Sequence, residues 1–144
     1  MALPIGGKIL LDTNVLIDFL RAGLHTDWVF GGQGSVVRFI SAVALLELRL
    51  GADTPKRKKA VDRIQEAFQA GRTLGLTPSM LDHAGRLFRV MHGNAAGLSD
   101  RLGPMNDILM ALTAREIGAT VITNNVLEFR RIAGKLPGLK VTAP

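Results

Sequence analysis

The sequence predicts an α/β fold in which a mainly parallel sheet carries helices on both faces. Short apolar runs typical of buried strands alternate along the chain with stretches whose apolar residues recur at helical spacing. The first apolar run ends in Asp12 and passes directly into a helical pattern. Such an order needs crossover connections, which make neighbouring strands parallel and lay the helices over the sheet.

The first strand and helix are the clearest elements. Residues 8–11 are apolar after the leading lysine, which indicates a buried strand. Residues 13–22 carry apolar side chains at helical spacing, and Gly23 is a favoured residue just beyond a helix end. Residues 23–35 are rich in glycine and polar residues, so they predict a short helix or a loop.

A second strand and helix follow. Residues 36–40 predict a strand, and Ser41 is a good N-cap for a helix over residues 42–51. The last two turns of this helix are almost wholly apolar, and we expect every side chain there except Glu47 and Arg49 to be buried.

The middle of the chain predicts two further helices. Pro55 is suited to the first turn of a helix with apolar residues at helical spacing. After a short strand at residues 73–76, Pro78 begins another helix, and Gly93 is its expected stop.

The last part of the chain returns to the strand and helix alternation. Residues 97–103 are expected to be irregular, and Pro104 is expected to start a helix that ends at Gly118. The remaining expected elements are a strand at 119–123, a short helix at 127–133 and a strand at 140–142.

The composition is that of a globular protein. The 144 residues, 47% hydrophobic and 21% charged, suit one domain over residues 1–144 with one core. The absence of cysteine excludes disulfides, thiolate catalysis and Cys-ligated metals. We expect no membrane segment and cytoplasmic residence, since no apolar run nears ~18 residues and no secretory signal pattern is present.

The chain is strongly basic, with a formal charge of +6 and a pI near 10.5. This charge favours an anionic partner such as nucleic acid, although a basic surface also serves solubility alone. The basic run from Lys56 to Lys59 has the same two interpretations, a solvated helix start or a patch that binds RNA.

Three acidic residues lie where a charge is costly or chemically useful. Asp12 follows the first strand, at the edge of a parallel sheet where ligands bind. Glu47 and Asp107 lie within otherwise apolar helical patterns. Because gathered carboxylates repel one another without a cation, their convergence would predict a metal site.

The donor set defines the metal and its chemistry. Carboxylate oxygens without cysteine or a histidine pair suit Mg²⁺ or Mn²⁺, which bind substrate phosphates and activate water. Each acid also has a structural alternative: Asp12 can cap the helix that follows it, Glu47 can face solvent, and Asp107 can complement a helix dipole near a helix start.

Four segments together resemble the PIN-domain nucleases, and specifically the VapC-type toxins of type II toxin-antitoxin systems. These segments are Asp12-Thr13-Asn14, Glu47 in its apolar helix, the stretch from Asn106 to Ala114, and the stretch from Thr123 to Phe129. The resemblance implies a three-layer α/β/α PIN-like fold with a mainly parallel central sheet. It also implies a Mg²⁺- or Mn²⁺-dependent endoribonuclease.

The resemblance assigns roles to individual residues. Asp12, Glu47 and Asp107 would be the acidic metal ligands, and Thr13, Asn14 and Thr123 would support them through hydrogen bonds. The sequence departs from the family where many members have a fourth acid, because that position is Asn125. An amide can ligate through its oxygen but brings no charge, so a second ion would bind more weakly. Glu128 lies three residues later, at a position more typical of a structural acid.

The resemblance also implies partners. These are an RNA substrate such as tRNA or rRNA, a VapB-type antitoxin that blocks the site, and a second copy of the chain, in a homodimer and a toxin-antitoxin hetero-oligomer. Candidate RNA-binding side chains are Arg49, Lys56, Arg57, Arg101, Arg130 and Arg131.

Two other functions stay open at this stage. A phosphatase with Asp12 as nucleophile would need a second aspartate at the position of Asn14. A non-catalytic RNA-binding or regulatory module is motivated by Asn125.

Overall fold

The computed structural model describes residues 7–31, 36–93 and 98–144. Within them, five strands form one sheet in the order β3-β2-β1-β4-β5, and every neighbouring pair is parallel. The predicted mainly parallel sheet is therefore confirmed. The strands are β1 (Lys8–Leu11), β2 (Val37–Ser41), β3 (Thr73–Leu74), β4 (Thr120–Ile122) and β5 (Lys140–Thr142).

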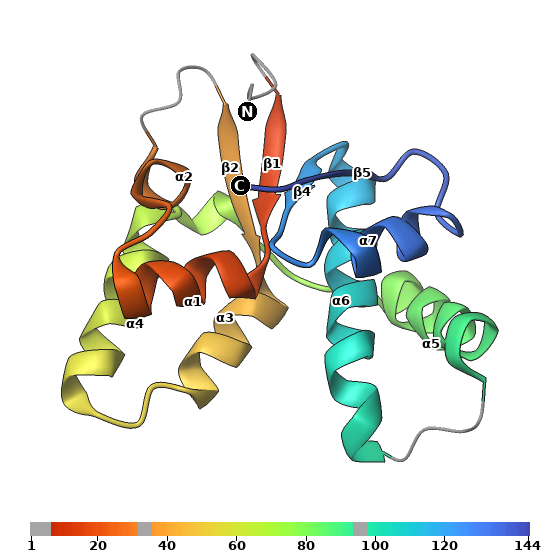
Figure 1. Ribbon diagram of the computed structural model, residues 1–144, viewed down its shortest axis with the longest axis horizontal. Coiled ribbons are helices and arrows are strands. Elements are labelled where there is room, and N and C mark those ends of the chain that lie inside the picture. Colours follow the sequence, from red (N-terminus) through yellow and green to blue (C-terminus); the bar gives the residue numbers. More distant parts are fainter. Residues whose placement is uncertain (1–6, 32–35, 94–97) are drawn as a thin grey trace.

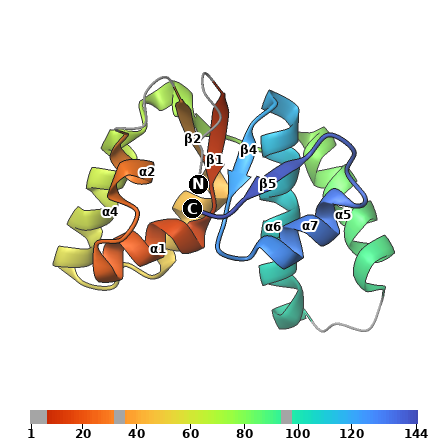
Figure 2. The ribbon, with the colours of Figure 1, turned by 45° about the horizontal axis from the view of Figure 1, so that its top comes forward.

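The helices cover the sheet from two sides, which gives the predicted three-layer arrangement (Figure 1). One group is α1 (Thr13–Ala22), α2 (Thr26–Phe30), α3 (Ala42–Leu50) and α4 (Pro55–Ala67). The other group is α5 (Pro78–His92), α6 (Leu98–Ile117) and α7 (Val126–Ala133), and a short 3-10 helix, Ala70–Arg72, precedes β3. The two groups remain on opposite sides of the strands in the second view (Figure 2).

The core lies between these layers. The side chains of Ile9, Leu10 and Leu11 are all at most 1% exposed, because helices cover both faces of the central strand. Phe129 and Ile132 of α7 are fully buried one turn apart. No helix among the described residues is long and apolar enough to cross a membrane.

The helix starts follow the expected capping chemistry. The Ser41 hydroxyl accepts a hydrogen bond from the Val43 amide at 3.1 Å, as the N-cap prediction requires. Pro55 and Pro78 lie in the first turns of α4 and α5, where a missing N–H costs nothing. At the end of α1, Gly23 adopts a left-handed conformation with φ of 66°.

Two sequence expectations are wrong. Residues 98–103 are helical, so α6 begins at Leu98 and Pro104 lies inside it, while residue 97 is outside the described part of the chain. A proline in a long helix removes one hydrogen bond, and the apolar packing of the later turns offsets that loss. In α3, Leu46 and Leu50 are 55% and 77% exposed, because only one face of the helix packs on the core.

The strand order reverses direction at β1. The chain runs from β1 outward to β2 and β3, then returns to place β4 on the other side of β1. Leu11 pairs with Ile122, so Asp12 and Thr123 leave the sheet side by side. This is the switch point at which open parallel sheets bind ligands.

Candidate active site

Asp12 is a buried acid at the carboxyl end of β1. Only 3% of its surface is exposed, and its backbone amide donates to the Ile122 carbonyl at 2.9 Å. Its carboxylate accepts hydrogen bonds from the Thr13 amide and from the Thr123 hydroxyl, both at 2.7 Å. Burial raises the pKa of Asp12, the two hydrogen bonds lower it, and the charge of Glu47 raises it.

The capping interpretation of Asp12 also holds. Asp12 is the N-cap of α1, and the hydrogen bond from the Thr13 amide is the capping contact. Capping uses one oxygen of the carboxylate, and the Thr123 hydroxyl binds the other. The cap therefore fixes the orientation of the carboxylate at the strand end.

Glu47 reaches the same site from α3. The Thr13 hydroxyl donates to its carboxylate at 2.7 Å, so Thr13 contacts Asp12 through its backbone and Glu47 through its side chain. Glu47 is partly buried, because it lies on the side of α3 that faces α1 and not on the solvent side with Leu46 and Leu50. The solvent-facing alternative for Glu47 is therefore wrong.

Asp107 is the third acid and has the largest electrostatic perturbation. It lies in the middle of α6, so the alternative of a role at a helix start is wrong. Burial, and to a smaller extent the negative charges of Asp12, Glu47 and Glu128, together raise the pKa of Asp107 to about 7. The structure thus places Asp12 and Glu47 near enough to Asp107 for their charges to raise its pKa.

Glu128 is an acid of this site that the sequence interpretation set aside. It lies in the first turn of α7, three residues after Asn125, and its charge acts on Asp107. It also forms an ion pair with Arg131 at 3.0 Å. The sequence signal for this role is the position of Glu128 as the third residue of α7, because a side chain there can reach back toward the helix start.

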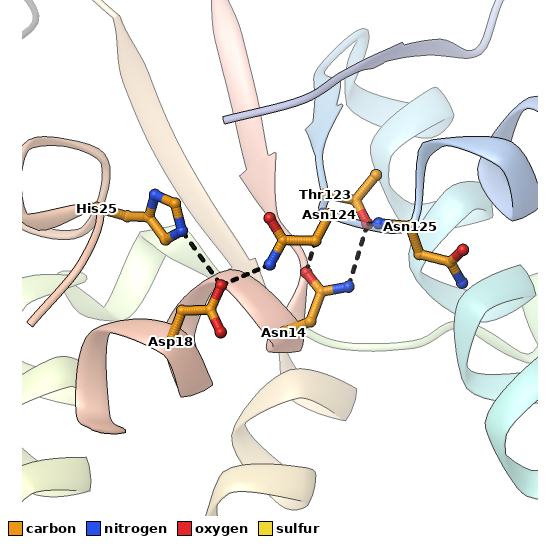
Figure 3. Close-up of polar contacts among 6 residues, drawn as sticks. All are labelled: Asn14, Asp18, His25, Thr123, Asn124 and Asn125. Carbon is orange, nitrogen blue, oxygen red and sulfur yellow. Dashed lines mark hydrogen bonds and ion pairs between the residues drawn. The ribbon is translucent and has the colours of Figure 1, made fainter. Parts of the chain in front are cut away.

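Polar side chains at the end of β4 complete the site (Figure 3). Thr123 is fully buried, and its hydroxyl accepts from the Asn125 amide at 2.9 Å and from the Asn14 side chain at 3.4 Å. Thr13 and Thr123 therefore donate directly to Glu47 and Asp12, whereas Asn14 reaches Asp12 only through Thr123. The side chain of Asn125 points away from Asn14 (Figure 3).

The predicted RNA-binding side chains differ in what they contact. Arg49 forms an ion pair with Asp62 at 2.7 Å, and Arg57 pairs with Asp53. Arg130 and Lys56 are exposed, Arg131 is the partner of Glu128, and the side chain of Arg101 is outside the described part of the structure.

A pocket of about 560 Å³ lies between α1, α3 and α4 and reaches the acidic site at Glu47. Its wall is apolar at Leu20, Leu48 and Ala60, among others. Its basic lining residues are Arg21, Lys56 and Arg57. The pocket therefore combines an apolar wall and positive charge with one acidic end.

The carboxylates have the chemistry of a site for a hard divalent ion. Within the described part of the chain, Asp12, Glu47 and Asp107 form no ion pair with a basic side chain. Their charges are left to act on one another, and a cation would relieve this repulsion. Across the same residues, no three acidic or histidine side chains converge closely enough to enclose an ion.

Comparisons with known proteins identify the family. The family model described as PIN domain matches residues 9–135. DNA-bound VapBC from Salmonella typhimurium contains a chain with 25% identity and a TM-score of 0.67, over 95% of this chain and 98% of that one. FitAcB from Neisseria gonorrhoeae has 25% identity and a TM-score of 0.62, and the match covers 92% of this chain and 95% of that one.

A further neighbour agrees in fold. VapBC-1 from nontypeable Haemophilus influenzae has 23% identity and a TM-score of 0.62, over 94% of this chain and 97% of that one. A search of curated protein sequences found no match. The match of the family model over most of the chain, together with the parallel sheet, shows that the chain belongs to the PIN domain family.

Proposed function

We propose that the protein is a divalent-metal-dependent endoribonuclease, a toxin of the VapC type that a VapB-type antitoxin neutralises. The observation that carries this proposal is the shared field of Asp12, Glu47 and Asp107 at the switch point of a PIN fold. A buried acid whose pKa is raised by neighbouring carboxylates, as for Asp107, is typical of a functional site.

The acids define the reaction. Asp12, Glu47 and Asp107 would hold Mg²⁺ or Mn²⁺, with Thr13 and Thr123 fixing two of the carboxylates through hydrogen bonds. When bound, the ion would supply the positive charge that activates water and stabilises the phosphate as the phosphodiester bond breaks. Glu128 would supply the fourth negative charge of the site, because the neutral amide of Asn125 stands where many family members have an acid.

The RNA would lie against basic side chains beside the acids. Lys56 and Arg57 line the pocket that ends at Glu47, and Arg130 is exposed on α7. Contacts of this kind bind phosphates without reading sequence, so RNA binding is expected to weaken steeply with salt. Arg49 and Arg57 are weaker candidates than Lys56 and Arg130, because Asp62 and Asp53 already pair with their guanidinium groups.

The antitoxin would occupy the pocket between α1, α3 and α4. The structural neighbours are complexes named VapBC and FitAB, some of them bound to DNA. An amphipathic segment with apolar and acidic side chains would complement the wall around Leu20 and the positive charges of Arg21 and Lys56. A basic side chain of the same segment would reach Glu47 and block the metal site. A homodimer and a toxin-antitoxin hetero-oligomer belong to this proposal.

A non-catalytic RNA-binding module is the second candidate. The amide at Asn125 favours it, because that side chain brings no charge to the site and points away from Asn14 (Figure 3). Membership in the PIN family removes the ground for an aspartate-nucleophile phosphatase.

Cleavage of a mixed pool of tRNA and rRNA by the purified, antitoxin-free chain tests the proposal. Mg²⁺ or Mn²⁺ should produce discrete fragments that disappear with EDTA and with the Asp107→Asn variant. An Asp82→Asn variant is the matched control, because Asp82 is an exposed acid on α5 that pairs with Arg86. RNA binding without cleavage under either ion would support the non-catalytic module.

A further inference from the structure

Asp18 is an acid near the site that has no role in the proposed chemistry. It lies in α1, and its carboxylate accepts a hydrogen bond from the Asn124 side chain at 2.7 Å (Figure 3). The same oxygen contacts the His25 ring nitrogen at 3.3 Å. Asp18 therefore joins α1 to the start of α2 and to the segment after β4.

The Asn124 contact continues to the buried acid. The Asn124 backbone amide donates to the Asn14 side-chain oxygen at 3.2 Å, and the Asn14 side-chain nitrogen donates to the Thr123 hydroxyl at 3.4 Å. That hydroxyl donates to Asp12 at 2.7 Å. A chain of hydrogen bonds thus runs from Asp18 to Thr123 (Figure 3), and the Thr123 hydroxyl extends it to the Asp12 carboxylate.

The direction of the Thr123 hydroxyl follows from these contacts. Its oxygen accepts from both Asn14 and the Asn125 amide, so its two acceptor positions are filled. The hydroxyl proton then has only the Asp12 carboxylate as its partner. Any loosening of the 123–125 segment would free this proton to turn away from Asp12.

We propose that Asp18 is a positioning residue for the acidic site. It acts through Asn124, whose orientation holds the 123–125 segment against α1 and keeps the Thr123 hydroxyl directed at Asp12. The inference rests on the proposed function, because the benefit of a fixed Asp12 is tighter binding of the divalent ion.

The helix geometry explains why one anchor is insufficient. Asn14 and Asp18 are four residues apart and therefore lie one turn apart on the same face of α1. Asn14 holds the backbone of Asn124, and Asp18 holds its side chain. Two points of attachment prevent the rotation that one would allow.

His25 strengthens the attachment. Among the described residues, it is the only residue other than glycine with a positive φ, at 62°. This conformation is unfavourable for a side-chain-bearing residue, so the contact with Asp18 offsets its cost. The carboxylate is consequently held from two sides.

The test compares Asp18→Ala, Asp18→Asn and Asn124→Ala in the full chain, with Asp82→Ala as control. Mn²⁺ affinity is measured by calorimetric titration, and amide hydrogen exchange at Asn125 is measured in EDTA. Asp18→Ala and Asn124→Ala should each weaken Mn²⁺ binding about five- to tenfold. Both should accelerate exchange of the Asn125 amide, and the double variant should be no worse than either single one.

Asp18→Asn distinguishes position from charge. Its amide oxygen can still accept from Asn124, so it should keep Mn²⁺ affinity within about twofold of the original chain. Equal losses in Asp18→Asn and Asp18→Ala would assign the effect to charge and overturn the proposal. Unchanged exchange at Asn125 in Asp18→Ala would overturn it as well.

The two proposals fail in different ways. If the unmodified chain binds no Mn²⁺, the metal-dependent function fails, and exchange at Asn125 in EDTA still decides whether Asp18 positions the segment. If the unmodified chain binds Mn²⁺ and Asp18→Ala binds it equally well, only the role of Asp18 is refuted.

Discussion

Replacing Asp107 with asparagine should stabilise the metal-free protein at pH 8 and should stabilise it less than half as much at pH 5. The pKa of Asp107 is about 7 in the folded chain, against an ordinary value of 3.8 that applies when the chain unfolds. The folded state therefore binds a proton more tightly. Well below pH 3.8 Asp107 is protonated in both the folded and the unfolded chain and there is no penalty, whereas above pH 7 the folded chain bears the full cost of the charge.

The size of the effect follows from the pKa shift. A difference of about three pH units corresponds to about 4 kcal/mol, and partial contact of Asp107 with solvent reduces this to about 2 kcal/mol. For a chain of this length, that gain raises the Tm by about 4–8 °C. At pH 5 the folded carboxyl is already neutral, so only the smaller penalty that builds up between 3.8 and 5 remains to be relieved.

Thermal unfolding in EDTA at pH 8 and pH 5 measures this prediction. Asp53→Asn is the control, because Arg57 lowers the pKa of that exposed acid and its removal should bring no gain at pH 8. An Asp107→Asn variant that is equally or less stable than the original chain at pH 8 would refute the reasoning. So would a stabilisation of the same size at both pH values.

Three further predictions concern the site and the core. Mn²⁺ affinity should be about tenfold weaker at pH 6 than at pH 8, because Asp107, with a pKa of about 7, must lose its proton before it can bind the ion. A Mn²⁺ affinity that does not change with pH in calorimetric titrations would contradict this prediction. Thr123→Val should cost about 1–3 kcal/mol in chemical denaturation by removing a donor to buried Asp12, whereas Thr123→Ser should restore most of it. In α3, Leu48→Ala should lower the free energy of unfolding by about 2–4 kcal/mol and Leu50→Ala by less than about 0.5 kcal/mol, since these side chains are 4% and 77% exposed. Equal losses in the two variants would show that the packing of α3 is wrong.

Local sequence signals are sufficient to give the alternation of strands and helices and the position of Asp12. Unbroken apolar runs such as residues 9–11 identify strands buried on both faces, and Ser41 and Pro55 identify helix starts. These signals are local, because capping and hydrophobic periodicity act within a few residues. Asp12 was placed by the same means, directly after a strand and before a helix.

The boundaries of α6 and the exposed face of α3 were less readable. A proline is compatible with a helix start and with a helix interior, so the residues before Pro104 could not be assigned from that signal. Leu46 and Leu50 are apolar in sequence but lie on the solvent side, because the neighbours of α3 cover only one face. The hydrophobicity of the residues in a short helix does not by itself indicate which face of the helix will pack against other elements.

The side chains that share the site are brought together by tertiary packing. The strand order places β4 beside β1, so Thr123 reaches Asp12 across more than one hundred residues of sequence. It also brings the charge of Glu128 to Asp107 and the side chain of Asn124 to Asp18. Local sequence patterns do not encode such contacts, because they depend on the packing of separate elements, and the burial that perturbs Asp107 exists only after folding.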